Sequence, residues 1–167
     1  MLKKIIVSIV ISASFLTLVH CVDDDVCITP TTPRLSFRLV QPSSDTVTAY
    51  VLDSLYVDKV NSDGTIQRVG KWAKVSDGKL PLNTDSNETV FNFYKTDTLA
   101  HPPKDVIVVK YQNGQKFVSK ACGFKFVFEN LSYELTQSVF VTKLVSNSTQ
   151  INDESEENLF IVYNPAP

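Results

Sequence analysis

Residues 106–121 read Val-Ile-Val-Val-Lys-Tyr-Gln-Asn-Gly-Gln-Lys-Phe-Val-Ser-Lys-Ala, and they carry the strongest fold signal in the chain. Both halves of this stretch are rich in β-branched and aromatic residues, which favour strands. Asn113-Gly114 lies between the halves, and a two-residue type I′ turn requires positive φ at both of its central positions. The sequence therefore predicts a tight hairpin, with Val109 opposite Val118.

Alternation of apolar and polar residues predicts short strands on both sides of this hairpin. In residues 34–40, Leu35, Phe37 and Leu39 point to one face and polar side chains to the other. Asp77-Gly78 is expected to form a turn. Further strands are expected at 54–60, 65–69, 72–75, 89–94, 124–131, 138–145 and 158–163, with an edge segment at 80–83. Eight or nine strands without helical spacing predict an all-β fold, an antiparallel immunoglobulin-like sandwich.

The first 20 residues have the pattern of a signal peptide. Lys3 and Lys4 precede an apolar run, 5–19, which is shorter than the roughly 20 residues of a membrane span. A retained membrane anchor is the alternative. We therefore expect a signal peptide over 1–20, a tether over 21–33 and a sandwich domain over 34–164.

The remaining chain is acidic. The 167 residues hold 16 Lys and Arg against 18 Asp and Glu, and the leader contains two of the lysines. Nucleic-acid binding requires a basic face, so we expect no nucleic-acid partner.

Leu18-Val19-His20-Cys21 resembles the processing site of bacterial lipoprotein precursors, although a small residue is usual in place of His20. The resemblance implies that Cys21 is acylated and becomes the first mature residue. Asp23, Asp24 and Asp25 follow, and they are similar to the acidic export signal of surface-exposed Bacteroidota lipoproteins. A solvated linker on a periplasmic lipoprotein is the alternative.

If Cys21 carries lipid, Cys27 and Cys122 are the remaining cysteines. Exported proteins occupy oxidising compartments, which favours a disulfide between these two. Two buried free thiols are the alternative.

Segments 25–35, 80–83 and 111–124 resemble a family of uncharacterised Bacteroidota lipoproteins, a domain of unknown function. The resemblance implies a lipoprotein of similar fold and implies no activity.

Catalytic signals are weak. His101 is the only histidine after the leader, and it lies in a proline-rich loop without a recognisable nucleophile motif. Residues 59–64 resemble part of a calcium loop, but Lys59 occupies the first ligand position and Gly70 the twelfth. Residues 153–157 are expected to form a solvated acidic loop. We therefore predict no catalytic residues, no metal and no cofactor.

Two surface functions are open. Trp72, Tyr50 and Tyr56 could form a stacking platform for sugars, or they could belong to the core and its margins. Thr46 and Thr98 each lie in an Asp-Thr-aliphatic triplet similar to the O-glycosylation acceptor of Bacteroidota, and Ser54 is a third match.

Taken together, these features predict an outer-membrane, surface-exposed lipoprotein that acts as a non-catalytic interaction or accessory subunit of an envelope complex. The expected partners are the membrane, through the lipid, and an outer-membrane protein such as a transporter or the barrel-assembly machinery. A glycan-binding module is the alternative, and an envelope enzyme is less favoured.

Overall fold

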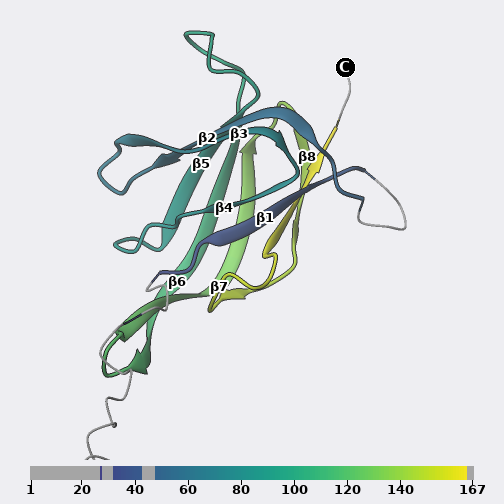
Figure 1. Cartoon of the computed structure of the whole chain (residues 1–167). Helices are drawn as coiled ribbons and strands as arrows, with labels where there is room; N and C mark the ends of the chain where they lie inside the picture. Colours follow the sequence, from purple (N-terminus) through teal and green to yellow (C-terminus); the bar gives the residue numbers. More distant parts are fainter. Residues whose placement is uncertain (1–26, 28–31, 43–47, 165–167) are drawn as a thin grey trace, which may run out of the picture.

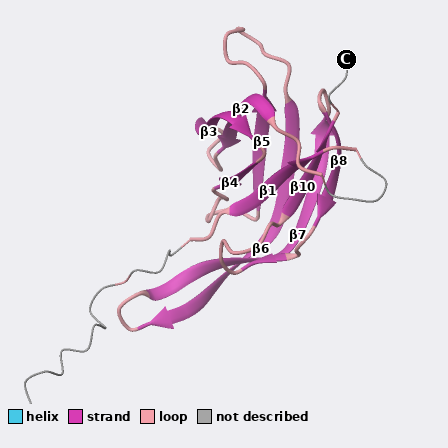
Figure 2. Cartoon of the chain, turned by 45° about the vertical axis from the view of Figure 1, so that its right-hand side comes forward, coloured by secondary structure: helices cyan, strands magenta, loops and turns pink. Residues whose placement is uncertain are grey.

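The computed structural model describes residue 27 and residues 32–42 and 48–164. These residues form ten strands in two sheets that pack face to face (Figures 1 and 2). The strands are β1 (Leu35–Val40), β2 (Leu52–Val60), β3 (Ile66–Val75), β4 (Asp77–Leu80), β5 (Glu88–Tyr94), β6 (Asp105–Ser119), β7 (Gly123–Gln137), β8 (Val141–Ser146), β9 (Gln150–Ile151) and β10 (Leu159–Tyr163).

One sheet has four strands in the order β4-β1-β10-β8, and the other has six in the order β3-β2-β5-β6-β7-β9. The strand pairs are antiparallel except that β1 runs parallel to β10. The predicted all-β sandwich is confirmed, with ten strands rather than eight or nine. Within the described residues, no helix is long and apolar enough to cross a membrane.

The core lies between the two sheets and follows the predicted alternation. Leu35, Phe37 and Leu39 of β1 are fully buried. The Phe37 ring meets the edge of the Phe93 ring at a centroid distance of 5.9 Å and of the Trp72 ring at 6.1 Å. Such edge-to-face contacts between aromatic rings add to the free energy gained by burial. The two sheets are thus joined by aromatic side chains from β1, β3 and β5.

The predicted turn at Asn113-Gly114 is wrong. Both residues lie inside β6, paired with Phe128 and Val127 of β7. The side-chain amide of Asn113 donates to the carbonyl oxygens of Thr84 (3.1 Å) and Ser86 (2.6 Å). A Cβ on Gly114 would lie 2.9 Å from a methyl group of Val127. Asn113 therefore ties β6 to the loop before β5, and glycine at position 114 leaves room for the Val127 side chain of β7.

The chain turns instead between Ser119 and Gly123. Gly123 has a φ of +67°, a left-handed conformation that glycine adopts without steric cost. The hydroxyl of Ser119 accepts a hydrogen bond from the backbone N–H of Cys122 at 3.1 Å. The two strands consequently continue past the sandwich as a long hairpin, which projects from the body at the bottom of Figure 1 and again in Figure 2.

The predicted turn at Asp77-Gly78 is also wrong, because these residues begin β4. Their partners are Arg38 and Phe37 of β1. A Cβ on Gly78 would lie 2.8 Å from the Phe37 ring, so glycine at this position makes room for a core aromatic.

Candidate functional site

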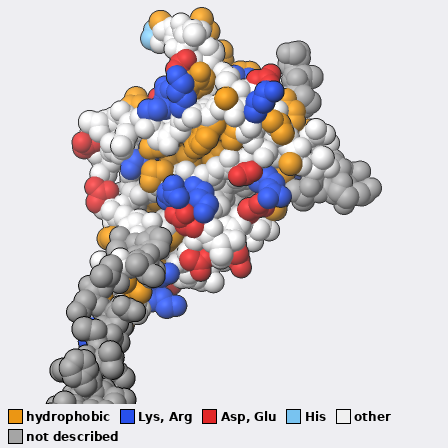
Figure 3. Space-filling model, viewed as in Figure 1, with side chains coloured by type: hydrophobic (Ala, Val, Ile, Leu, Met, Phe, Trp, Pro, Cys, Tyr) orange, Lys and Arg blue, Asp and Glu red, His pale blue; other side chains and the backbone are white. Residues whose placement is uncertain are grey.

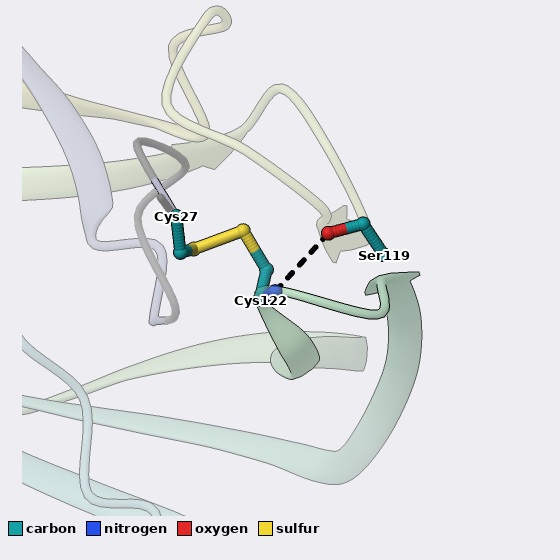
Figure 4. Close-up of a disulfide and its surroundings, with 3 residues drawn as sticks. All are labelled: Cys27, Ser119 and Cys122. Carbon is teal, nitrogen blue, oxygen red and sulfur yellow. Dashed lines mark hydrogen bonds between the residues drawn. A yellow bond between two sulfur atoms is a disulfide. The ribbon is translucent and has the colours of Figure 1, made fainter. Parts of the chain in front are cut away.

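Cys27 and Cys122 form a disulfide, with their Cα atoms 4.8 Å apart (Figure 4). This confirms the predicted pairing. Cys122 lies in the turn of the β6–β7 hairpin, next to Ser119. The bond therefore fastens the segment that precedes β1 to the tip of the longest hairpin in the described structure, rather than to the core.

An exposed aromatic pair lies beside this disulfide. Phe117 of β6 and Phe124 of β7 are 56% and 61% exposed, and their ring centroids are 5.5 Å apart. They face each other because the strands pair Phe117 with Phe124 in register. The sequence prediction missed this pair, since it paired the strand that holds Phe117 with residues 106–112 and gave the strand from Phe124 onward no partner.

The predicted lipid and export residues, Cys21 and Asp23 to Asp25, lie outside the described residues, as does Thr46. Thr98 is exposed in the loop between β5 and β6. Its hydroxyl lies 2.9 Å from that of Thr96. This loop is at the top of Figure 1 and the hairpin tip at the bottom, so Thr98 and the disulfide occupy opposite ends of the molecule.

His101 is exposed in the same loop and lines an open hollow of about 360 Å³. Asp97 of the same loop also lines this hollow, and its carboxylate lies 3.7 Å from the side chains of both Arg68 and Lys71. Among the described residues, no group of three or more His, Cys, Asp and Glu side chains is placed to hold a metal ion. On the face shown in Figure 3, acidic and basic side chains are intermixed.

A larger hollow, of about 740 Å³, lies beside the β2–β3 turn. Asn83 donates from its amide to the carbonyl oxygens of Val60 and Glu88, both at 3.2 Å. The Tyr111 hydroxyl donates to the Asn83 carbonyl at 2.8 Å, and burial raises the pKa of Tyr111. These buried polar groups of the hollow bond to one another and hold the loop before β5.

The three aromatic residues considered as a sugar platform do not share a surface. Trp72 is paired with buried Leu55 and faces the core, whereas Tyr56, the next residue along β2, faces outward. Tyr50 stacks on Tyr163 at a centroid distance of 5.7 Å. Tyr50, Tyr56 and Trp72 therefore lie in three separate environments and do not form one stacking platform.

The sequence predicted a solvated acidic loop at 153–157, but two of its carboxylates bind basic side chains of the sandwich. The Glu154 carboxylate accepts hydrogen bonds from the Arg34 side chain at 2.7 and 2.9 Å and from Lys79 at 2.9 Å. Glu157 forms an ion pair with Arg38. These contacts fasten the loop before β10 onto β1 and β4.

We expect the Glu154 contacts to make stability depend on pH. The hydrogen bonds from Arg34, with a smaller contribution from Lys79, lower the pKa of Glu154 from 4.5 to about 2. The stabilisation is therefore complete above the usual pKa and is lost as the pH falls from 4.5 through about 2. Replacing Glu154 with Gln should cost about 1 kcal/mol of unfolding free energy at neutral pH, because exposed Arg34 is screened by solvent.

Urea unfolding of both proteins across this pH range tests the prediction. The difference between wild type and Glu154→Gln should shrink towards zero at acid pH. Glu156→Gln, a change at an exposed glutamate of the same loop, is the matched control and should have little effect. A pH-independent difference would show that the loss has another origin.

A buried carboxylate binds the backbone of the connection between β7 and β8. Asp105 is fully buried at the start of β6. Its Oδ1 atom accepts backbone N–H groups from Val139 at 2.6 Å, Phe140 at 2.9 Å and Val141 at 3.1 Å. Oδ2 is also buried, without a hydrogen-bond partner among the described residues. No sequence pattern indicates this role, because the acceptor and the donors are more than thirty positions apart.

Comparison with known proteins places this arrangement in one family. No curated protein and no solved structure matches the chain. The model of a family of unknown function, DUF6452, matches residues 44–163. The matched region spans β2 to β10, including the whole β6–β7 hairpin and Cys122. The match covers well over half of the chain, and the protein therefore belongs to the DUF6452 family of unknown function.

Proposed function

We propose that this chain is an outer-membrane lipoprotein of a Bacteroidota bacterium, anchored through Cys21 and displayed at the cell surface. In this proposal it acts as a non-catalytic accessory subunit of an envelope protein complex. The order of charged residues, apolar run and Cys21 in the leader supports the anchor. Asp23, Asp24 and Asp25 support surface display, which cleavage by protease added to whole cells would test.

The Cys27–Cys122 disulfide is the observation that carries the proposal. Disulfides persist in exported proteins and are rare in the reducing cytosol, so the bond supports export. It also limits how far the body can move from its anchor. Six residue steps separate Cys21 from Cys27, and an extended chain of that length spans at most roughly 20 Å.

A short tether favours a partner that is itself in the membrane. Because the disulfide lies at the hairpin tip, the lipid would hold that end of the sandwich near the bilayer. The sides of the two sheets would then lie at the height of the rim of a neighbouring transporter or of the barrel-assembly machinery. Confinement of both proteins to one surface raises their effective concentration and permits a weak contact to persist.

Lengthening the tether tests this function. A Gly-Ser insert of about 20 residues after Asp25 adds a mean reach of about 25 Å. Co-purification of the partner from mildly solubilised membranes should weaken several-fold, because the effective concentration falls with linker length. An insert of about five residues is the control and should have a smaller effect. Unchanged co-purification with the long insert would contradict the proposed contact near the membrane.

A further inference from the structure

The tip of the β6–β7 hairpin has an unusual surface for this protein. Other aromatic pairs lie in the core: Phe37 with Phe93 and Tyr111 with Phe128 have both rings buried. Phe117 and Phe124 pack against each other and remain more than half exposed. Exposing two large apolar rings to water is unfavourable, and such exposed apolar groups often mark a binding surface. We therefore expect a partner to cover this pair in the functional state.

The charged residues in the turn and the adjoining ends of the two strands are all basic. Residues 115–125 contain Lys116, Lys120 and Lys125 and no acidic residue, although the chain as a whole is net acidic. Lys116 is paired directly opposite Lys125 across the two strands. Like charges in that position destabilise a hairpin, and here the Lys125 ammonium donates a hydrogen bond to the carbonyl oxygen of Asn152. The remaining lysines of the tip, Lys116 and Lys120, favour an anionic partner.

The position of the tip identifies which anionic partner. The disulfide joins Cys122, inside the tip, to Cys27 (Figure 4). Cys21 lies only six residue steps before Cys27. Apolar rings surrounded by lysines are also the combination that binds the boundary between lipid headgroups and acyl chains. Lysine stems can lie along the apolar surface while their ammonium groups reach the phosphates.

We propose that the hairpin tip is a second membrane contact, in which Phe117 and Phe124 enter an anionic bilayer surface and Lys116 and Lys120 bind lipid phosphates. The orientation towards the membrane rests on the proposed anchor at Cys21, but the affinity of the tip for lipid does not. The lipid on Cys21 would keep the protein from dissociating from the membrane, and the tip would determine which end of the sandwich faces the bilayer. The loop that holds Thr98 and His101, at the opposite end, would face away from it.

Vesicle binding tests the tip without the lipid. The mature chain from residue 21 with Cys21→Ser keeps all ten described strands and both disulfide cysteines. We expect it to sediment with vesicles of phosphatidylcholine and phosphatidylglycerol. Binding should weaken about tenfold on pure phosphatidylcholine, or when salt rises from about 0.1 M to about 0.5 M, because ions screen the lysines.

Two pairs of substitutions give the test a matched control. Phe117→Ser with Phe124→Ser should reduce binding about tenfold or more, because the apolar contribution scales with the area buried. Ile66→Ser with Leu99→Ser removes two side chains of similar exposure, 65% and 55%, that line the hollow beside His101. This control should bind vesicles as the parent does. Cooperative urea unfolding of each variant shows that it is folded.

The outcomes separate the possible occupants of the tip. Absence of vesicle binding by the parent, or equal loss in both pairs of variants, would overturn the proposal. A dimer that Phe117→Ser with Phe124→Ser dissociates would identify a second copy as the occupant and would also overturn it. Neither outcome would count against the proposed acylation of Cys21, because palmitate labelling tests that modification separately.

Discussion

Replacing Cys27 and Cys122 together with Ser should lower the free energy of unfolding by roughly 4–5 kcal/mol, the largest effect that we expect from any side-chain change. The bond spans a sequence separation of 95 residues, and closing so long a loop removes much of the entropy of the unfolded chain. The bond lies at the hairpin turn, outside the core. The loss should therefore come from the unfolded state, with the two sheets intact.

Urea unfolding of the mature chain measures this effect. Wild type treated with a reductant should show the same midpoint as the double variant, since both lack only the bond. Cys21→Ser is the matched control and should unfold as the wild type does. A double variant within about 1 kcal/mol of wild type would mean that the disulfide contributes little to the fold, against the chain-entropy expectation.

Asp105→Ala should have the second largest effect, a loss of about 3 kcal/mol or more, because three backbone hydrogen bonds are lost and buried donors are costly to leave unpaired. The substitution removes the oxygen that accepts hydrogen bonds from the N–H groups of Val139, Phe140 and Val141. Asp105→Asn keeps one acceptor oxygen and should lose less. In Asp105→Ala, the backbone amides of the connection between β7 and β8 should exchange their hydrogens faster than in wild type.

Chemical denaturation and hydrogen exchange together test this role. Asp53→Ala, at an exposed position of β2, is the control and should change stability little. A loss of under about 1 kcal/mol in Asp105→Ala, without faster exchange in residues 139–141, would show that the three backbone groups find other partners.

The sequence was sufficient for the fold class because local patterns carry it. Alternation located β1, where the three predicted inward residues are fully buried, and Asn61 to Gly64 formed the predicted turn between β2 and β3. The predicted hairpin failed for a physical reason. Asn-Gly favours a turn locally, but Asn113 bonds to a distant loop and Gly114 is covered by Val127. Tertiary contacts thus outweighed the local preference.

The site was less accessible from the sequence than the fold. The disulfide could be predicted because only two cysteines remained once Cys21 was assigned to a lipid. The partners of Glu154 could not, because Arg34 lies 120 residues away and only the packing of β1 beside β10 brings them together. The pairing of Phe117 with Phe124 could not be predicted either, because it depends on the register between β6 and β7.

The central claim is that a lipid on Cys21 holds the disulfide-linked end of this sandwich at the membrane. Growth with labelled palmitate, followed by membrane isolation, tests it most directly. We predict that wild type and the Cys27→Ser, Cys122→Ser variant carry the label, whereas Cys21→Ala carries none and leaves the membrane in high salt. Labelled Cys21→Ala, or unlabelled wild type, would contradict the account.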